Sequence, residues 1–159
     1  CQLIRAGEPV RVDGLALEPY ATSHDARESV AYVVHCKNRK LGHATDMGIV
    51  IPTAREKLKN ANVLLVESNH DVEMLDVGPY PWSVKQRIKS KLGHLSNEAC
   101  GDLLATLSHA GLKQVVLMHL SHTNNHPEIA YITARQAMGS HAPHMVLAQQ
   151  DRATELVEV

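Results

Sequence analysis

The chain has 159 residues, of which 44% are hydrophobic and 21% are charged, with a net charge of -1 at pH 7. These values are typical of one globular domain, and we expect a single domain over residues 1–159. No apolar run approaches the roughly 20 residues that span a bilayer, and the near-neutral charge excludes a general attraction for polyanions, so no membrane partner is expected.

The first part of the chain has the pattern of an antiparallel meander. Asp13-Gly14 is a two-residue turn typical of a β-hairpin. The predicted elements here are strands at Val10–Val12, Leu15–Leu17, Val30–Val34 and Leu41–Thr45, and a helix at Thr53–Ala61 after Pro52.

The second part alternates buried strands with helices, as βαβ units do. Ser96 is a candidate N-cap, and Gly111 and Gly139 are candidate helix ends. The predicted strands are Val63–Val66, Val115–Met118, Met145–Ala148 and Leu156–Val159, and the predicted helices are Trp82–Lys91, the segment from Ser96 to Gly111, and the segment from Pro127 to Gly139. A meander that continues into such units predicts an α/β fold.

Polar clusters follow four of the predicted strands. They are TSHDA at 22–26, ATDMG at 44–48, ESNHD at 67–71 and HLSHTNN at 119–125. This arrangement is typical of a site at the carboxyl edge of a sheet. Imidazole and carboxylate ligands together suit zinc or manganese, and a carboxylate between two histidine sites can bridge two metals.

These motifs, together with ESNHDVEML and GHLSN, resemble the metallo-β-lactamase superfamily, and within it the single-domain nucleases of the WalJ/YycJ type. The resemblance implies an αββα sandwich and two divalent metal ions, zinc or manganese. It also implies a 5′-to-3′ DNA exonuclease in which a hydroxide between the two metals hydrolyses the phosphodiester.

The same resemblance implies roles for four residues. His24 and His119 would each hold a metal, Asp46 would bridge the two metals, and His94 would act beside the scissile phosphate. Judged from the residues alone, Asp46 could instead be a turn residue, His24 a strand terminator, and His94 a polar residue before the Ser96 cap.

One main motif of the superfamily, HxHxDH, does not occur in this chain, which starts at Cys1 without a methionine. We therefore expect this chain to be the C-terminal part of the fold, with the missing N-terminal half as its partner. The isolated chain is expected to be inactive.

Other polar residues of the clusters have supporting roles in this interpretation. Glu67, His70 and Asp71 are expected to orient metal-bound imidazoles or to fix their loop. Asn124 and Asn125 either contact substrate or form Asx turns. The remaining histidines of this region and of the C-terminal segment are interpreted as surface residues, namely His122, His126, His141 and His144.

A run of cations precedes GHLSN. It consists of Lys85, Arg87, Lys89 and Lys91. It is either a solvated helix face or a set of contacts to DNA phosphates. Trp82 could stack on a base, although packing is the more common role for such an aromatic.

Three functions remain open on the sequence. The first is the exonuclease, acting on DNA or RNA. The second keeps the fold but hydrolyses a small ester, thioester or lactone. The third is a non-catalytic half that binds a partner. Three cysteines without CxxC spacing fit a reducing compartment, so a cytoplasmic location is expected, and homo-oligomerisation is left open.

Overall fold

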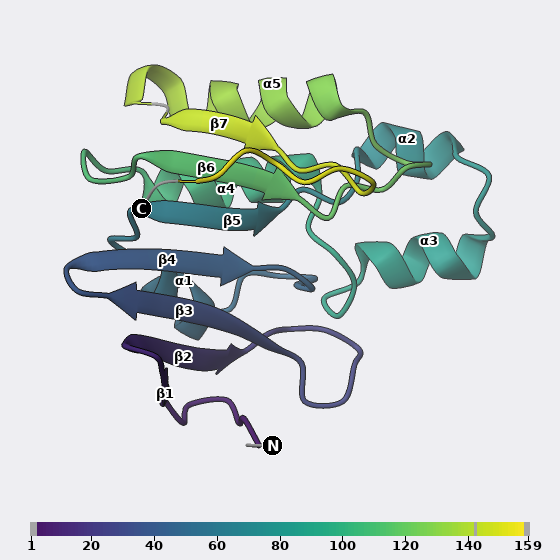
Figure 1. The fold of residues 1–159 in the computed structure, drawn as a ribbon. Helices are drawn as coiled ribbons and strands as arrows, with labels where there is room; N and C mark the ends of the chain where they lie inside the picture. The colour runs from purple at the N-terminus through teal and green to yellow at the C-terminus, as the bar shows by residue number, and fades with distance from the viewer. Residues whose placement is uncertain (1–2, 142, 158–159) are drawn as a thin grey trace.

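The computed structural model describes residues 3–141 and 143–157 and contains a seven-stranded sheet whose strands follow chain order (Figure 1). The strands are β1 (Val10–Val12), β2 (Leu15–Ala21), β3 (Val30–Cys36), β4 (Arg39–Ala44), β5 (Val63–Glu67), β6 (Gln114–Met118) and β7 (His144–Leu147). Strands β1 to β4 pair antiparallel, and β4 to β7 pair parallel. The predicted meander that continues into βαβ units is confirmed.

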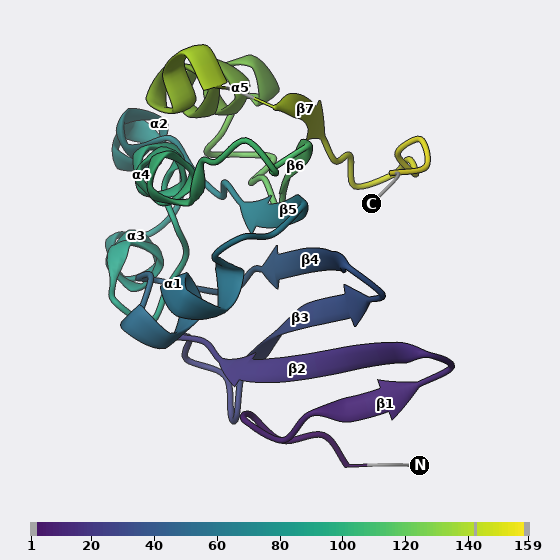
Figure 2. The ribbon, with the colours of Figure 1, turned by 90° about the vertical axis from the view of Figure 1, so that its left-hand side faces the viewer.

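The helices of the described chain lie against one face of this sheet, as Figure 2 shows. They are α1 (Pro52–Leu58), α2 (Val72–Val77), α3 (Trp82–Lys89), α4 (Asn97–Leu107), α5 (Pro127–Met138) and a 3-10 turn, η1 (Gly139–His141). This is one helix layer on one sheet, which is half of the predicted αββα sandwich.

The helix-covered face of the sheet holds the core. Val33, Leu64 and Val115 lie in register across β3, β5 and β6, and none has exposed surface. Gly42 lies in the same row, and a Cβ there would lie 2.6 Å from Cδ2 of Leu58 in α1. The absence of a side chain at this position lets α1 pack directly on the sheet.

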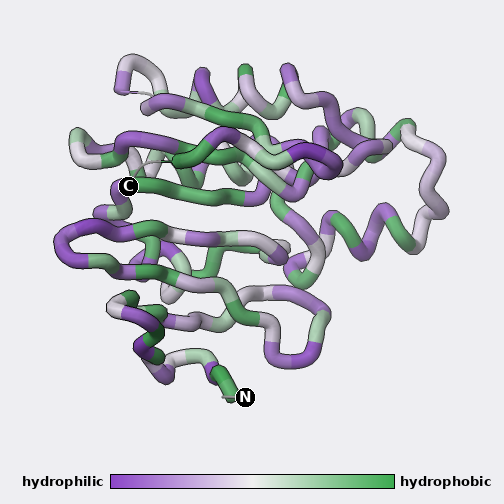
Figure 3. Tube along the Cα trace, in the orientation of Figure 1, coloured by the Kyte–Doolittle hydropathy of each residue, from purple (hydrophilic) through white to green (hydrophobic). Residues whose placement is uncertain are grey.

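The opposite face is apolar but carries no helix of the described chain. Leu17, Val34 and Leu41 lie in register across β2, β3 and β4 and are half-buried or partly exposed. In Figure 3, β5 is hydrophobic along most of its length. A strand with apolar side chains on both faces is typical of a sheet that is covered on both sides.

The structure differs from the prediction at a few ends and in one helix. The strand predicted over 156–159 is wrong where it can be judged: Leu156 is 99% exposed and has no neighbouring strand to pack on, and residues 158–159 lie outside the described chain. Helix α2 was not predicted, because its six residues are too few for a helical period to be recognised.

Among residues 3–141 and 143–157, no helix combines the length and the apolar character needed to cross a membrane.

The two faces predict different costs for core truncation in this chain. Leu64→Ala should lower the free energy of unfolding by about 2–5 kcal/mol, because Leu64 is fully buried under the helices. Leu41→Ala, on the neighbouring strand but the opposite face, should cost roughly half as much or less. Urea denaturation of both variants measures the difference, and equal costs would contradict an uncovered face.

Candidate metal centre

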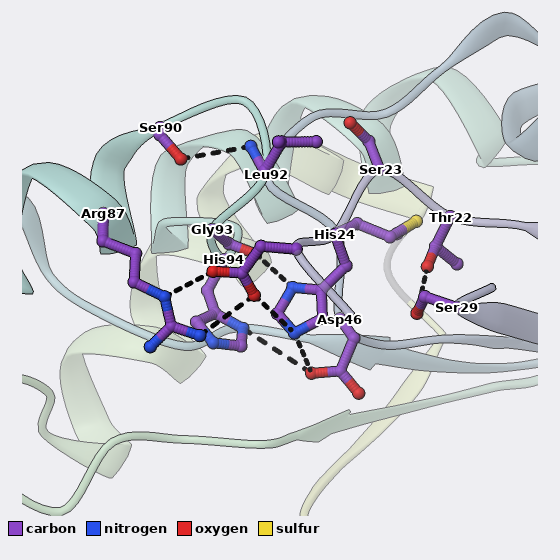
Figure 4. Close-up of polar contacts among 12 residues, drawn as sticks. Thr22, Ser23, His24, Ser29, Asp46, Arg87, Ser90, Leu92, Gly93 and His94 are labelled. Carbon is purple, nitrogen blue, oxygen red and sulfur yellow. Dashed lines mark hydrogen bonds and ion pairs between the residues drawn. The ribbon is translucent and has the colours of Figure 1, made fainter. Parts of the chain in front are cut away.

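The strand-end clusters meet beside α3 at the carboxyl edge of the sheet (Figure 1). His24 follows β2, Asp46 follows β4 and His119 follows β6, while His94 lies between α3 and α4. Because these strands end at the same edge, residues far apart in the chain approach one another. Figure 4 shows His24, Asp46 and His94 facing a common point.

One carboxylate oxygen lies at the middle of this group. Oδ1 of Asp46 is 3.6 Å from Nε2 of His24, 3.8 Å from Nδ1 of His94 and 3.9 Å from Nδ1 of His119. The ring centroid of His94 is 5.0 Å from that of His24 and 5.1 Å from that of His119. The structure thus brings His24, Asp46 and His119 together, as their strand-end positions predicted, and their roles as ligands stay predictions.

Glu67, the last residue of β5, lies beneath this group with no exposed surface. Its Oε1 accepts hydrogen bonds from Nδ1 of His94 at 2.6 Å and from Nδ1 of His119 at 2.9 Å. Its Oε2 accepts from the backbone N–H of Met47 at 3.0 Å. A carboxylate that holds both Nδ1 hydrogens leaves the Nε2 atoms of both imidazoles as the available ligand or proton-transfer atoms.

The pKa values of Glu67 and His119 are shifted by their contact with each other. Burial raises the pKa of the Glu67 carboxyl, but the hydrogen bonds from His119 and His94 outweigh this effect, and its pKa lies below the ordinary value. The hydrogen bond to Glu67 raises the pKa of the His119 imidazole, against the opposing effect of burial. Each of these two groups therefore favours the charged form of the other.

The backbone is in the left-handed region at two of these positions. Asp46 has a φ of 55° and His119 a φ of 60°. This conformation is uncommon for residues with a Cβ, although Asp and His adopt it more often than most, and it occurs at functional sites where the surrounding structure determines the backbone. His119 directly follows β6 and Asp46 comes two residues after the end of β4, so the left-handed turns lead the chain out of the sheet at the site.

The loop after β4 is held against the segment between α3 and α4. The N–H of Gly48 donates to the carbonyl of Ser23 at 2.8 Å. A Cβ at Gly48 would lie 2.4 Å from the backbone carbon of Lys91, so only glycine permits this approach. The Asp46 loop and the His24 loop are therefore fixed to each other and to one backbone segment.

The residues expected to support the imidazoles have different positions. Glu67 contacts two of them, as described above. Asp71 instead caps α2 and accepts from the N–H of Met74 at 2.8 Å. His70 is 2% exposed, and burial lowers the pKa of its imidazole. A supporting role for His70 and Asp71 stays a prediction.

Asn124 and Asn125 are both buried, at 1% and 6% exposure. Nδ2 of Asn125 donates to the carbonyl of Ser68 at 2.8 Å and to Oδ1 of Asn97 at 3.0 Å. The N–H of Asn124 donates to Oγ of Ser121 at 3.1 Å. The side-chain contacts of Asn125 favour a role in shaping the loop, whereas the buried side chain of Asn124 has no hydrogen-bond partner among the described residues. Substrate contact by the two asparagines stays a prediction.

Three of the four cations in the predicted phosphate-binding run already have protein partners. Nζ of Lys85 donates to the carbonyl of Asp76 at 2.8 Å, and Lys89 pairs with the Asp76 carboxylate. Arg87 forms a two-pronged ion pair with Asp25. This pair could not be read from the sequence, because the two residues are 62 positions apart. Trp82 is 71% exposed, so its packing interpretation is wrong.

The donor set fits a divalent metal ion. Asp46, Glu67, His94 and His119 bring one nitrogen or oxygen atom each within 4.8 Å of one another. Because Glu67 accepts from both Nδ1 atoms, the two imidazoles would bind a metal through Nε2. Nε2 of His24 adds a further imidazole nitrogen next to Asp46. Nitrogen and carboxylate oxygen donors at such spacing suit zinc or manganese.

The contact between Glu67 and His119 predicts a pH dependence for the metal-free chain. The pKa of His119 is raised, so its contribution to stability is complete below the unfolded pKa of about 6.5 and is lost as the pH rises through the folded pKa. The pKa of Glu67 is lowered, so its contribution is present above about 4.5 and is lost as the pH falls.

Urea unfolding with a chelator present, at about pH 5.5 and pH 8.5, tests this dependence. The buried His43 and His70, whose pKa burial lowers, contribute in the opposite direction in every variant, so the test is the difference between wild type and Glu67→Gln. Because His119 is partly exposed, its titration should cost the wild-type chain only a few tenths of a kcal/mol, roughly, between these pH values. Glu67→Gln should abolish this loss. An equal loss in the variant would show that another group titrates.

Comparison with known proteins identifies the family. A family model described as a beta-lactamase superfamily domain matches residues 1–120. Exodeoxyribonuclease YycJ of Bacillus anthracis is 39% identical over 136 residues, which cover 86% of this chain and 52% of the relative. Exodeoxyribonuclease WalJ of Streptococcus pneumoniae serotype 2 is 33% identical over 163 residues, which cover 99% of this chain and 61% of the relative. This chain thus spans little more than half the length of these curated relatives.

Solved structures agree on the fold. The metallo-β-lactamase fold protein YhfI of Bacillus subtilis superposes with a TM-score of 0.67 at 14% identity, covering 92% of this chain and 50% of that one. Zn(2+)-bound PqqB of Methylobacterium extorquens superposes with a TM-score of 0.62 at 18% identity, covering 92% and 52%. With the family model and the curated relatives, these matches show that the chain belongs to the metallo-β-lactamase superfamily and is of the WalJ/YycJ type.

Proposed function

We propose that this chain supplies one side of the metal centre of a phosphodiester hydrolase that acts as a 5′-to-3′ DNA exonuclease. One observation carries the proposal: a fully buried carboxylate, Glu67, holds His94 and His119 around the Asp46 carboxylate. Ordinary surface histidines do not need such a support, whereas imidazoles that bind metals or transfer protons do.

Asp46, His24 and His119 would hold the metal ions, zinc or manganese, with Asp46 between the two histidines. Bound divalent ions would activate a water molecule and polarise the phosphoryl oxygens. His94 would hold a proton at Nε2 for the leaving oxygen, because its Nδ1 is fixed by Glu67. The hydrogen bond from Nδ1 to Glu67 would fix the orientation of the ring for this transfer.

The substrate class is supported by two observations. The curated relatives that match this chain are named exodeoxyribonucleases. Helix α3, which precedes His94 in the chain, carries groups that suit a nucleic acid, namely the exposed Trp82 and the lysines Lys85 and Lys89. RNA or a small ester, thioester or lactone is the alternative substrate, and the nearly neutral charge of the chain is consistent with the small substrate.

The rest of the metal centre would come from the N-terminal half of the fold. The HxHxDH motif is not in this chain, and the apolar sheet face of Leu17, Val34 and Leu41 has no helix of the described chain against it. A second sheet packed there would complete the sandwich and add ligands at the same edge. In this proposal the chain alone is a non-catalytic half, and a cytoplasmic location stays a prediction.

If this chain holds only part of the metal centre, a half-site, its activity after purification can be predicted. With zinc or manganese supplied, we expect negligible turnover of DNA and of a chromogenic phosphodiester, because ligands are missing. Release of nitrophenolate from bis(nitrophenyl) phosphate measures the activity. Robust turnover that Asp46→Ala abolishes would contradict the half-site.

The lysines predict a salt dependence of DNA binding by the native protein. Lys85→Gln, Lys89→Gln and Lys91→Gln together should flatten the slope of log K against log salt by about one to three units, since each phosphate contact contributes roughly -0.9. A phosphate would have to replace Asp76 as the partner of Lys85 and Lys89. Arg87 is left unchanged in this variant because Asp25 occupies its guanidinium.

The matched control removes equal charge from the opposite edge of the sheet, with Lys37→Gln, Lys59→Gln and Lys113→Gln. This variant should keep the wild-type slope, because local contacts and not the total charge determine counterion release. Equal slopes in both variants would show that Lys85, Lys89 and Lys91 are solvated and do not contact phosphates. This result would favour the small-substrate alternative.

A further inference from the structure

The loop that carries His24 rests on the segment between α3 and α4, residue by residue. Oγ of Ser23 donates to the carbonyl of Lys91 at 2.7 Å. The N–H of Asp25 donates to the carbonyl of Leu92 at 3.1 Å. Nδ1 of His24 is 3.0 Å from the carbonyl of Gly93. The position of His24 is therefore set by this segment and not by the sheet alone.

The contact with Gly93 determines the tautomer of His24. A carbonyl oxygen only accepts hydrogen bonds, so Nδ1 of His24 must carry the hydrogen. Nε2 then keeps its lone pair, and this atom is the one that lies 3.6 Å from Oδ1 of Asp46. His24 is thus prepared to bind a metal beside Asp46 only while the loop stays on this segment.

A bidentate ion pair between Arg87 and Asp25 also joins the His24 loop to α3. Nη2 of Arg87 donates to Oδ1 of Asp25 at 2.9 Å, and Nε of Arg87 donates to Oδ2. Oδ1 of Asp25 is also 3.6 Å from Nε2 of His24, the same distance as Oδ1 of Asp46. Arg87 therefore holds the loop and at the same time engages a carboxylate that would otherwise compete for Nε2 of His24.

We propose that Asp25 and Arg87 are a positioning pair that holds His24 in its metal-binding orientation, so that Arg87 serves the metal centre and does not contact the DNA backbone. The inference rests on the proposed metal centre and deepens it. The planar guanidinium of Arg87 can donate two parallel hydrogen bonds to one carboxylate. This geometry fixes the orientation of the Asp25 carboxylate as well as its distance from Arg87.

Metal affinity is the direct readout. Cobalt(II) titration of the native protein, followed by its visible absorption and by competition with a chromogenic chelator, measures both affinity and ligand geometry. Arg87→Gln should weaken cobalt(II) binding by about tenfold. This is the low end of the effect expected for groups that orient metal ligands, because the Asp25–Arg87 pair is partly exposed. Arg87→Lys, which keeps the charge but not the fork, should lose about threefold.

A double-mutant cycle tests the pairing itself. Asp25→Asn should weaken metal binding about as much as Arg87→Gln, and the double variant should lose no more than either alone, since both remove the same contact. All three variants should keep the wild-type salt slope on duplex DNA. Lys59→Gln, which breaks the exposed Glu56–Lys59 pair on the far side of the sheet, should leave both measurements unchanged.

The outcomes separate the two hypotheses. Normal cobalt(II) binding by Arg87→Gln, with a slope flatter by about 0.9, would make Arg87 a phosphate contact and overturn the positioning pair alone. A steeper slope in Asp25→Asn, which frees the guanidinium for DNA, would also overturn it. If the native protein binds cobalt(II) no more tightly than Asp46→Ala does, the proposed metal centre fails as well.

Discussion

The candidate centre depends on one buried charge. Glu67 places a carboxylate at the end of β5 with no exposed surface, and removal of such a group from water costs several kcal/mol, roughly, unless it is paired. The N–H of Met47 and the two imidazoles of His94 and His119 provide that pairing. Because Met47 follows β4 and His119 follows β6, the three segments cannot shift without leaving this charge unpaired.

The left-handed backbone at Asp46 and His119 turns the chain out of the sheet beside this charge. The φ angles are 55° and 60°, just past the ends of β4 and β6, and the two side chains approach each other there. The close approach of Gly48 to the backbone of Lys91 holds the Asp46 loop in place. The surrounding packing thus determines the backbone at the site.

The segment between α3 and α4 connects the two sides of the centre. It provides His94, and its backbone carbonyls receive the hydrogen bonds of the His24 loop. The cations of α3 have two different kinds of partner. Lys85 and Lys89 are bound to one exposed aspartate and could exchange it for phosphate, whereas the fork of Arg87 is matched to Asp25.

The sequence by itself determined the α/β fold, the change from antiparallel to parallel strands, and the meeting of His24, Asp46 and His119, because hydrophobic runs specify parallel strands and such strands end at one edge. Only the tertiary structure decided which groups pair at that edge. Glu67 is 27 and 52 positions from its imidazoles, and Arg87 is 62 positions from Asp25. No local period links residues at such separations, so their partners depend on the packing of α3 and of the strand-end loops against each other.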